Sequence, residues 1–389
     1  MDAKKTLAEL SSAGLLRSLK NSSVSGSRIE MDGSECLNFA SNDYLGLTGR
    51  PDFQREFLES IKDCKKFVMG AASSRLLGGN NFAFAELEKF LSEVYSEISN
   101  SEKSALLFNC GYHANTGILP ALASSEDLIL ADKLSHASII DSLKLSDAKW
   151  ARFKHNDLSD LRRILEKRRG EFKEVFIATE SVFSMDGDIA DIAELVKIKE
   201  EFGARLYVDE AHAFGVFGPK GLGLCAASGR LADIDIAMCT LGKAAAGEGA
   251  FAVCSPEIRA LLINRCRPFI FTTAIAPINA LWARFICEKI FSADALRAEL
   301  RRLSALLKDL LGGIETLGDS QIVPIIVGDE KYASEFSAEL LRRGIYAPAI
   351  RYPTVAKGAA RLRASVTAAV SESEIKLLAE EVGLLMGRK

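Results

Sequence analysis

The sequence predicts an α/β fold, with a mostly parallel, doubly wound sheet in a large domain and a second, smaller α+β domain. Between residues 105 and 254, short apolar runs alternate with helical segments, and this order is typical of a parallel sheet covered on both faces. Beyond about residue 277, a long helix and isolated strands replace the alternation. A chain of 389 residues has room for two or three such units.

Six apolar runs are the predicted strands of the large sheet. Each is apolar along most of its length, as expected for a strand that is buried on both faces. The runs are 105–108, 127–131, 174–179, 204–208, 234–240 and 249–254. Between two of them, Ile192, Leu195, Val196 and Ile198 form one stripe of a helix predicted at 189–201.

The C-terminal part predicts an α+β unit of its own. Leucines at helical spacing from Leu296 to Leu310 predict a long helix, and a capping box at Ser371 and Glu374 opens the last one. The elements expected between them are a strand at 322–327, a helix at 331–343 and a strand at 361–367. The expected segments are 1–44, which joins the small domain, 45–275, the large domain, and 276–389, the small domain.

Composition and charge exclude several classes of protein. Lys and Arg total 49 against 52 Asp and Glu, so the net charge of -3 predicts neither a nucleic-acid partner nor binding to an anionic membrane. The N-terminus lacks the apolar core of a secretory signal, and we expect a cytoplasmic protein. The eight cysteines form no C-x-x-C pair and read as buried thiols in a reducing compartment. No metal site is predicted.

The densest polar residues follow the ends of predicted strands. Asp209 and His212 come just after one strand, at the edge where open α/β sheets bind ligands. Thr240 and Lys243 follow the next strand, and a lysine delivered into a small-residue loop can lose its charge and become a Schiff-base amine. Taken singly, the first pair fits an ion pair with a helix cap equally well, and the lysine fits a surface residue.

Together, these groups match the needs of a pyridinium cofactor. Such a cofactor needs a carboxylate at its ring nitrogen, an amine, donors for a phosphate and a flat group against the ring. Asp209, Lys243 and Thr240 supply the first three kinds of group, together with the strand-to-helix turn at 109–115. His136 can supply the flat group.

The same residues lie in motifs that resemble the α-oxoamine synthases, a family of enzymes that use pyridoxal 5'-phosphate (PLP). Among them are LNFASNDYLG at 37–46, VDEAH at 208–212 and TLGK at 240–243. The other resembling stretches are 70–75, 131–138, 153–157, 179–188, 267–274, 348–355 and 360–363. The resemblance covers nearly the whole chain. It implies fold type I of the PLP-dependent transferases, the aspartate-aminotransferase-like fold, with 45–275 as the PLP-binding domain.

The resemblance also implies roles at the cofactor. Lys243 would carry PLP and move the Cα proton, and Asp209 would keep the ring nitrogen protonated. His212 would bond the phenolic oxygen, His136 would stack on the ring, and Ser184 would lie beside the phenolic oxygen or the substrate. The residues that would hold the phosphate are Gly111, Tyr112 and Thr240, joined by Thr272 or Thr273 from a partner subunit.

The resemblance implies amino-acid and acyl-CoA substrates and a homodimer that shares its active site. Asn42 and Arg363 would bind the amino-acid carboxylate, and Arg75 would lie near the site at the subunit interface. Strand alternation makes Arg361 and Arg363 point the same way, so geometry alone does not choose between them.

Within the family, 269–274 and 348–355 favour L-alanine and pimeloyl-CoA, or a pimeloyl carrier-protein thioester, as substrates. The alternatives are glycine with acetyl-CoA and serine with a long acyl-CoA. A non-catalytic partner subunit of the same fold is a remoter alternative, because Lys243, Asp209 and His212 are all present. The small-residue loop Ala244–Gly249 departs from the usual pattern beside the cofactor.

Overall fold

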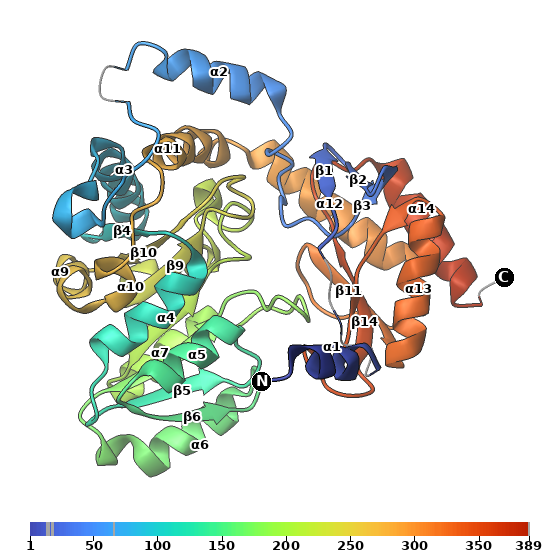
Figure 1. Ribbon diagram of the computed structural model, residues 1–389. Helices are drawn as coiled ribbons and strands as arrows, with labels where there is room; N and C mark the ends of the chain where they lie inside the picture. The colour runs from blue at the N-terminus through green and yellow to red at the C-terminus, as the bar shows by residue number, and fades with distance from the viewer. Residues whose placement is uncertain (13–15, 17–18, 65–66, 388–389) are drawn as a thin grey trace.

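The computed structural model describes residues 1–12, 16, 19–64 and 67–387. Figure 1 shows two bodies side by side, a larger one built on a long sheet and a smaller one that contains both ends of the chain. Part of the predicted segment 1–44 and the last two residues of 276–389 lie outside the described residues, as do residues 65–66.

A seven-stranded sheet forms the centre of the larger body, in the order β4-β10-β9-β8-β7-β5-β6. Its strands are β4 (Ser104–Phe108), β5 (Leu128–Asp132), β6 (Lys149–Phe153), β7 (Val175–Glu180), β8 (Arg205–Asp209), β9 (Ile236–Thr240) and β10 (Ala250–Cys254). The neighbours from β9 to β6 pair in parallel, whereas β10 is antiparallel to both β4 and β9. The carboxyl ends of all strands except β10 therefore meet at one edge.

Alternating residues of the strands enter two separate cores. Leu128 and Leu130 of β5 belong to one core, and Ile129 and Ala131 belong to the other. The helices of this body are α2 (Pro51–Ile61), α3 (Phe82–Ser99), α4 (Gly111–Leu122), α5 (Ala137–Leu145), α6 (Leu158–Arg168), α7 (Ile192–Phe202), α8 (Leu224–Ala227), α9 (Pro256–Arg265), α10 (Arg267–Ile270) and α11 (Pro277–Phe291). Shorter turns are η1 (Arg75–Gly79), η2 (Arg169–Glu171), η3 (Pro219–Gly221) and η4 (Leu231–Asp233). With helices on both faces, the sheet is doubly wound.

The six predicted strands are all present, with ends shifted by up to two residues. The sequence analysis missed β6, an edge strand in which Lys149, Trp150 and Arg152 are exposed, so that it lacks an apolar run. The β-then-α order also does not reveal that β10 runs antiparallel. The predicted helix at 189–201 is α7, which begins after the N-cap Asp191 and buries its predicted stripe.

The smaller body joins the two ends of the chain. Two small sheets have the orders β1-β2-β3-β12 and β11-β14-β13. Their strands are β1 (Ser22–Ser25), β2 (Arg28–Met31), β3 (Ser34–Asn38), β11 (Ile322–Gly328), β12 (Ile345–Tyr346), β13 (Ala349–Ile350) and β14 (Ala360–Ser365). The helices are α1 (Ala3–Ser12), α12 (Asp294–Leu310), α13 (Glu330–Arg342) and α14 (Glu372–Leu385), and the predicted capping box opens α14.

The N-terminal strands belong with the C-terminal ones. Leu37 and Asn38 of β3 pair in parallel with Ile345 and Tyr346 of β12. In Figure 1 the blue β1–β3 accordingly lie beside the orange and red helices. The domain limits at 44 and 275 stay a prediction. Among the described residues, no helix is long and apolar enough to cross a membrane.

Candidate active site

Polar side chains from five strands, β4, β5, β7, β8 and β9, and from the turns that follow them surround one cavity of about 190 Å³. The cavity lies at the carboxyl edge of the large sheet, where open α/β sheets bind ligands. Gly111 follows β4, His136 follows β5, Asp209 ends β8, and Lys243 follows β9. The structure therefore brings together residues that lie as far apart in the sequence as Gly111 and Lys243.

Asp209 is a buried carboxylate at the bottom of this cavity, with only 4% of its surface exposed. Its Oδ2 accepts a 2.8 Å hydrogen bond from Asn115 Nδ2, and its Oδ1 accepts one of 2.8 Å from the Ala211 amide. Asn115 is itself held by Tyr207, whose hydroxyl donates to its Oδ1. Within the described part of the chain, Asp209 has no ion-pair partner, so it lies ready for a cationic ligand group.

Lys243 lies directly beside His212 in the cavity. Its Nζ lies 2.8 Å from His212 Nε2. Burial lowers the pKa of Lys243 to about 8, although Asp209 and Glu180 act in the opposite direction. Burial also lowers the pKa of His212 well below its usual range, helped by Lys243. A neutral imidazole beside a lysine that is readily deprotonated suits formation of a Schiff base.

The start of α4 lines the other end of the cavity. Gly111 and Tyr112 are its first two residues, and the first amides of a helix have no acceptor within the helix. A Cβ atom at Gly111 would lie at an ordinary contact distance of 3.8 Å from Thr240 Cβ, so the helix start and Thr240 lie side by side. This end has the donors and the helix dipole that a phosphate requires.

Thr272 and Thr273 lie near this helix start but do not line the cavity in the single chain. The Thr273 carbonyl accepts a 2.6 Å hydrogen bond from Asn109 Nδ2, two residues before Gly111. The predicted contribution of these threonines from a partner subunit stays a prediction.

His136 lines the cavity with an exposed ring and caps the start of α5. Its Nδ1 lies 2.7 Å from Ser138 Oγ, and its backbone amide donates to the Glu180 carboxyl group. Burial raises the pKa of Glu180 well above its usual range, and the nearby Asp209 adds to this shift. The two contacts fix the ring where it can lie against a flat ligand.

Arg361 and Arg363 of β14 have different partners. Arg361 forms an ion pair with Asp186, whereas Arg363, 6% exposed, forms none with any described carboxylate. Arg363 instead donates to Asn42 Oδ1 at 3.2 Å and to the Ser184 carbonyl at 2.6 Å. The positive charge of Arg363 is therefore the one that remains available for a substrate carboxylate.

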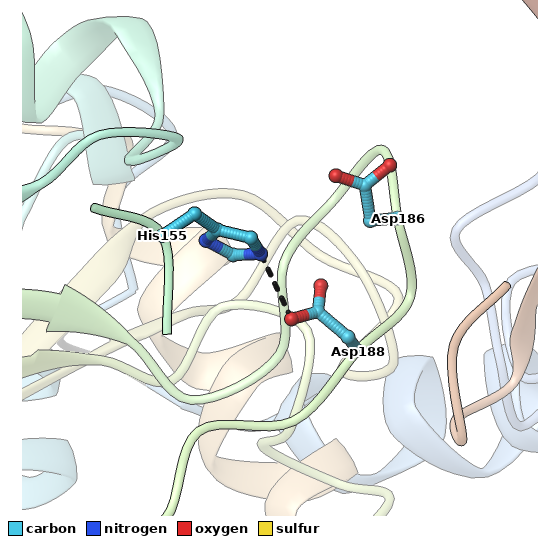
Figure 2. Close-up of side chains that lie close together, drawn as sticks. All are labelled: His155, Asp186 and Asp188. Atoms are coloured by element: carbon cyan, nitrogen blue, oxygen red, sulfur yellow. Dashed lines mark hydrogen bonds and ion pairs between the residues drawn. The ribbon is translucent and has the colours of Figure 1, made fainter. Parts of the chain in front are cut away.

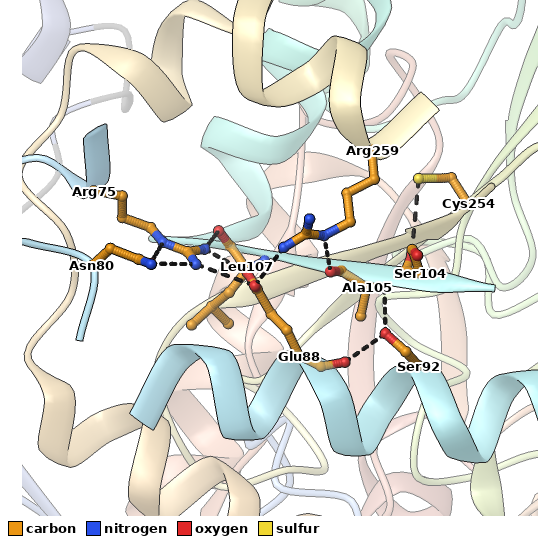
Figure 3. Close-up of polar contacts among 9 residues, drawn as sticks. All are labelled: Arg75, Asn80, Glu88, Ser92, Ser104, Ala105, Leu107, Cys254 and Arg259. Carbon is orange, nitrogen blue, oxygen red and sulfur yellow. Dashed lines mark hydrogen bonds and ion pairs between the residues drawn. The ribbon is translucent and has the colours of Figure 1, made fainter. Parts of the chain in front are cut away.

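Besides the two threonines, the predicted site residues that do not line the cavity are Asn42, Arg75, Ser184 and Arg363. Ser184 lines a neighbouring cavity of about 150 Å³ together with Arg361. Arg75 forms a buried ion pair with Glu88, which Arg259 also contacts, and donates to Asn80 as well (Figure 3). Both edges of the Arg75 guanidinium group are thus engaged inside the chain, and its predicted place near the substrate at a subunit interface stays a prediction.

His155 is the centre of a further cluster with Asp186 and Asp188 (Figure 2). Its two ring nitrogens each lie 2.9 Å from a carboxylate, Nδ1 from Asp132 and Nε2 from Asp188. Burial opposes the charge, but the two carboxylates outweigh it and raise the pKa of His155 to about 9. With both ring nitrogens at carboxylates, His155 is a clamp between the end of β5 and the turn that carries Ser184.

Sequence reasoning missed several residues that shape the site. Glu180 ends β7 inside the resembling stretch 179–188, and Asn115 closes the strand-to-helix turn at 109–115, but the sequence analysis gives neither of them a role. Tyr44 lies two residues after Asn42, and its hydroxyl is 2.6 Å from His212 Nδ1. The unusual loop after Lys243 is held from outside, because Trp282 Nε1 donates to the Ala246 carbonyl at 2.8 Å.

A lysine of lowered pKa that shares a cavity with an unpaired buried carboxylate, at the carboxyl edge of a mostly parallel sheet, defines a PLP-dependent enzyme of fold type I. Residues 34–382 match the family model described as aminotransferase class I and II, and the chain belongs to this family. Its cofactor is PLP. The donor set described above fits this cofactor, with Asp209 for the ring nitrogen, Lys243 for the aldehyde carbon and the start of α4 for the phosphate.

Relatives with a named activity show which enzymes of this family the chain is similar to. The 8-amino-7-oxononanoate synthase of Haemophilus ducreyi is 45% identical over 378 residues, which cover 95% of this chain and 96% of the relative. The enzyme of the same name from Chlorobaculum parvum is 44% identical over 360 residues, 91% of this chain and 90% of the relative. The resemblance to the α-oxoamine synthases is thereby confirmed.

Solved structures with a similar fold support the same family assignment. Serine palmitoyltransferase from Sphingomonas wittichii has a TM-score of 0.87 at 29% identity and covers 99% of this chain and 96% of its own. An 8-amino-7-oxononanoate synthase from Francisella tularensis has a TM-score of 0.74 at 29% identity, covering 90% of this chain and 98% of its own. The predicted fold class, cofactor and enzyme class are confirmed.

Proposed function

We propose that the chain condenses L-alanine with a pimeloyl thioester, carried by CoA or by a carrier protein, and releases CO2 and the free thiol. The product is 8-amino-7-oxononanoate, an intermediate of biotin biosynthesis. The observation that supports this function most is that relatives up to 45% identical over nearly the whole chain are named for this product. The cavity between Asp209 and Lys243 provides the groups that the chemistry requires.

PLP, when bound, supplies an electron sink that makes the bonds at the Cα atom of an amino acid easier to break. Asp209 would hold the proton on the ring nitrogen, and His212 would face the phenolic oxygen. His136 would lie against the ring. The amides of Gly111 and Tyr112 and the hydroxyl of Thr240 take the phosphate, because a helix start favours anions.

Arg363 and Asn42 bind the carboxylate of L-alanine and so orient the Cα–H bond toward Lys243. Once its amine is free, Lys243 accepts the Cα proton and later returns one to the product. The pKa of about 8 suits this exchange, since an amine that titrates near neutral pH both accepts and donates protons readily. Ser184, whose carbonyl accepts from Arg363, keeps the arginine in place from the far side.

The proposed assembly is a homodimer in which Thr272 or Thr273 reaches the phosphate of the other subunit. The edge around them is unusually apolar for a free surface, with Leu76, Leu77 and Phe271 all at least half exposed. The Ala274 amide donates to the Ser73 carbonyl, so the two segments lie together. A second copy would cover this edge. The expected cytoplasmic location stays a prediction.

Serine with a long-chain acyl-CoA is the second candidate pair of substrates. It is favoured by the overall shape, since serine palmitoyltransferases match this chain with a TM-score of 0.87 against 0.74 for the Francisella enzyme. The higher identity to the named 8-amino-7-oxononanoate synthases favours the first pair. Glycine with acetyl-CoA is a third pair to be compared.

The test is a panel of three amino acids and three thioesters with the PLP-loaded enzyme. L-alanine, glycine and L-serine are each paired with pimeloyl-CoA, acetyl-CoA and palmitoyl-CoA, and products are identified by mass spectrometry. We expect the highest kcat/KM for L-alanine with pimeloyl-CoA, and no product with Lys243→Ala. A clear preference for serine with palmitoyl-CoA would replace the proposed substrates with the second pair.

A further inference from the structure

Five side chains form one continuous line of polar contacts from the cavity to the small domain. Lys243 Nζ lies 2.8 Å from His212 Nε2, and His212 Nδ1 lies 2.6 Å from the Tyr44 hydroxyl. The Tyr44 hydroxyl lies 3.1 Å from Asn42 Oδ1, to which Arg363 donates at 3.2 Å. Tyr44 is fully buried in the middle of this line.

The direction of these hydrogen bonds follows from what each group can donate. Asn42 presents its oxygen, because Arg363 on the other side can only donate. An amide oxygen only accepts, so the single proton of Tyr44 points to Asn42. The contact between Tyr44 and His212 then needs a proton on Nδ1 of the imidazole. This leaves Nε2 as an acceptor for Lys243.

We propose that Tyr44 is a positioning residue that sets the tautomer of His212 in the cofactor-free chain and links His212 to the carboxylate-binding pair Asn42 and Arg363. The neutral state of His212 fits this role, because burial lowers its pKa well below the usual range. The Gln321 side chain also holds His212 in place, because it donates a 2.8 Å hydrogen bond to the backbone carbonyl of His212. Because hydrogen bonds hold both the backbone and Nδ1 of His212, its imidazole ring keeps one orientation toward the cavity.

A hydroxyl group suits this position because it can both donate and accept. When PLP is bound as proposed above, its phenolic oxygen needs a donor, and His212 must then carry its proton on Nε2. Tyr44 can follow by turning its own proton from Asn42 to Nδ1. Phenylalanine at this position would fill the same space and could do neither. The kinetic part of the inference rests on the proposed function, whereas the tautomer does not.

The matched variants are Tyr44→Phe and Tyr95→Phe. Tyr95 is also fully buried, and its hydroxyl donates to the Leu222 carbonyl at 3.2 Å, away from the cavity. Both variants lose one buried hydroxyl, so effects of stability alone appear in both. Far-UV circular dichroism and the thermal midpoint show whether each variant keeps its fold.

The first readout is the 15N spectrum of the histidine rings in the full chain. The chain has only four histidines, and the variant His212→Asn assigns the signals of His212. Without PLP, we expect the proton of His212 on Nδ1 in the wild type and in Tyr95→Phe, and a mixture of tautomers in Tyr44→Phe. An unchanged single tautomer in Tyr44→Phe, or a proton on Nε2 in the cofactor-free wild type, would overturn the proposal.

The second readout separates the link to the carboxylate site. In Tyr44→Phe we expect the KM for L-alanine to rise about fivefold, the effect of one lost hydrogen bond, with the KM for pimeloyl-CoA unchanged. Tyr95→Phe should leave both values as in the wild type. Equal KM values in the two variants would refute the link to Asn42 and Arg363. If no condensation occurs at all, the proposed function fails, while the nitrogen spectrum still decides on the tautomer.

Discussion

The reactivity of this site depends on one amine that loses its proton easily. Burial lowers the pKa of Lys243 from 10.5 to about 8, and only the unprotonated amine attacks an aldehyde. We expect the rate at which the cofactor-free chain captures PLP to rise with pH and to level off above about 8. Stopped-flow absorbance measures this rate. A midpoint near the ordinary lysine value of 10.5 would contradict the environment described for Lys243.

Asp209 and Glu180 are neighbouring buried carboxyl groups with different expected roles. Asp209 has no cation partner in the described chain, whereas burial and the nearby Asp209 raise the pKa of Glu180 well above its usual range. Asp209→Asn should lower kcat by roughly two to three orders of magnitude, since an unpaired buried charge costs about 3–5 kcal/mol. Glu180→Gln should retain most of the activity. Similar kcat values in the two variants would show that Asp209 does not pair with the cofactor.

The residues that sequence reasoning found are those at strand ends. Lys243, Asp209 and His136 each follow an apolar strand, so the carboxyl-edge rule locates them without any structure. The rule does not identify Tyr44, which comes from a segment with no strand-end signal, and it does not single out Asn115 within the turn at 109–115, because both act through other side chains. It also could not choose between Arg361 and Arg363, and the ion pair of Arg361 with Asp186 supports the choice of Arg363, which stays a prediction.

At the scale of elements, His155 clamps the end of β5 to the turn after β7 through Asp132 and Asp188. Its pKa of about 9 in the folded chain exceeds the ordinary 6.5, so the charged ring stabilises the fold. The contribution, at most about 3 kcal/mol, is complete below pH 6.5 and is lost as the pH rises through 9. Urea unfolding should show this loss in the wild type and a flatter pH profile in His155→Gln. Parallel pH profiles would rule out the clamp.

Glu88 joins α3 to the sheet edge. Its carboxylate accepts hydrogen bonds from Arg75, Arg259 and the Leu107 amide of β4 (Figure 3). Almost none of the Glu88 side chain is exposed. Replacing a buried charge that has two cationic partners leaves them unpaired, so Glu88→Gln should lower the free energy of unfolding by about 3–5 kcal/mol. Denaturant unfolding measures the change. Glu93→Gln, on the exposed face of the same helix, is the control and should change it little.

The predictability of an element depended on how completely it is buried. The strands with apolar runs, such as β5 and β7, were predicted to within one residue at each end. The edge strand β6 was missed because one of its sides faces solvent, and its sequence therefore lacks the apolar run of a buried strand. The antiparallel direction of β10 follows from its pairing with β9, because the nine residues between the two strands are too few for the crossover that parallel neighbours need, and the sequence analysis did not use this signal.

At the scale of the whole molecule, the apolar edge formed by Leu76, Leu77 and Phe271 predicts a dimer. Leu77 is 86% exposed in the single chain, so a charge there costs the isolated fold little. We expect Leu77→Glu to shift the mass measured by light scattering from two chains to one and to weaken PLP binding. Leu384→Glu, at an exposed position of α14, should do neither. A monomeric wild type with full activity would exclude a shared site.

The stoichiometry of the reaction tests the account most directly. The family includes aminotransferases by name, which move an amino group and keep every carbon atom, whereas a decarboxylative condensation loses one. With L-alanine labelled with 13C at the carboxyl carbon and with pimeloyl-CoA, we predict one labelled CO2 and one free CoA for each unlabelled amino ketone formed. Formation of labelled pyruvate, with pimeloyl-CoA left intact and no labelled CO2, would contradict the account.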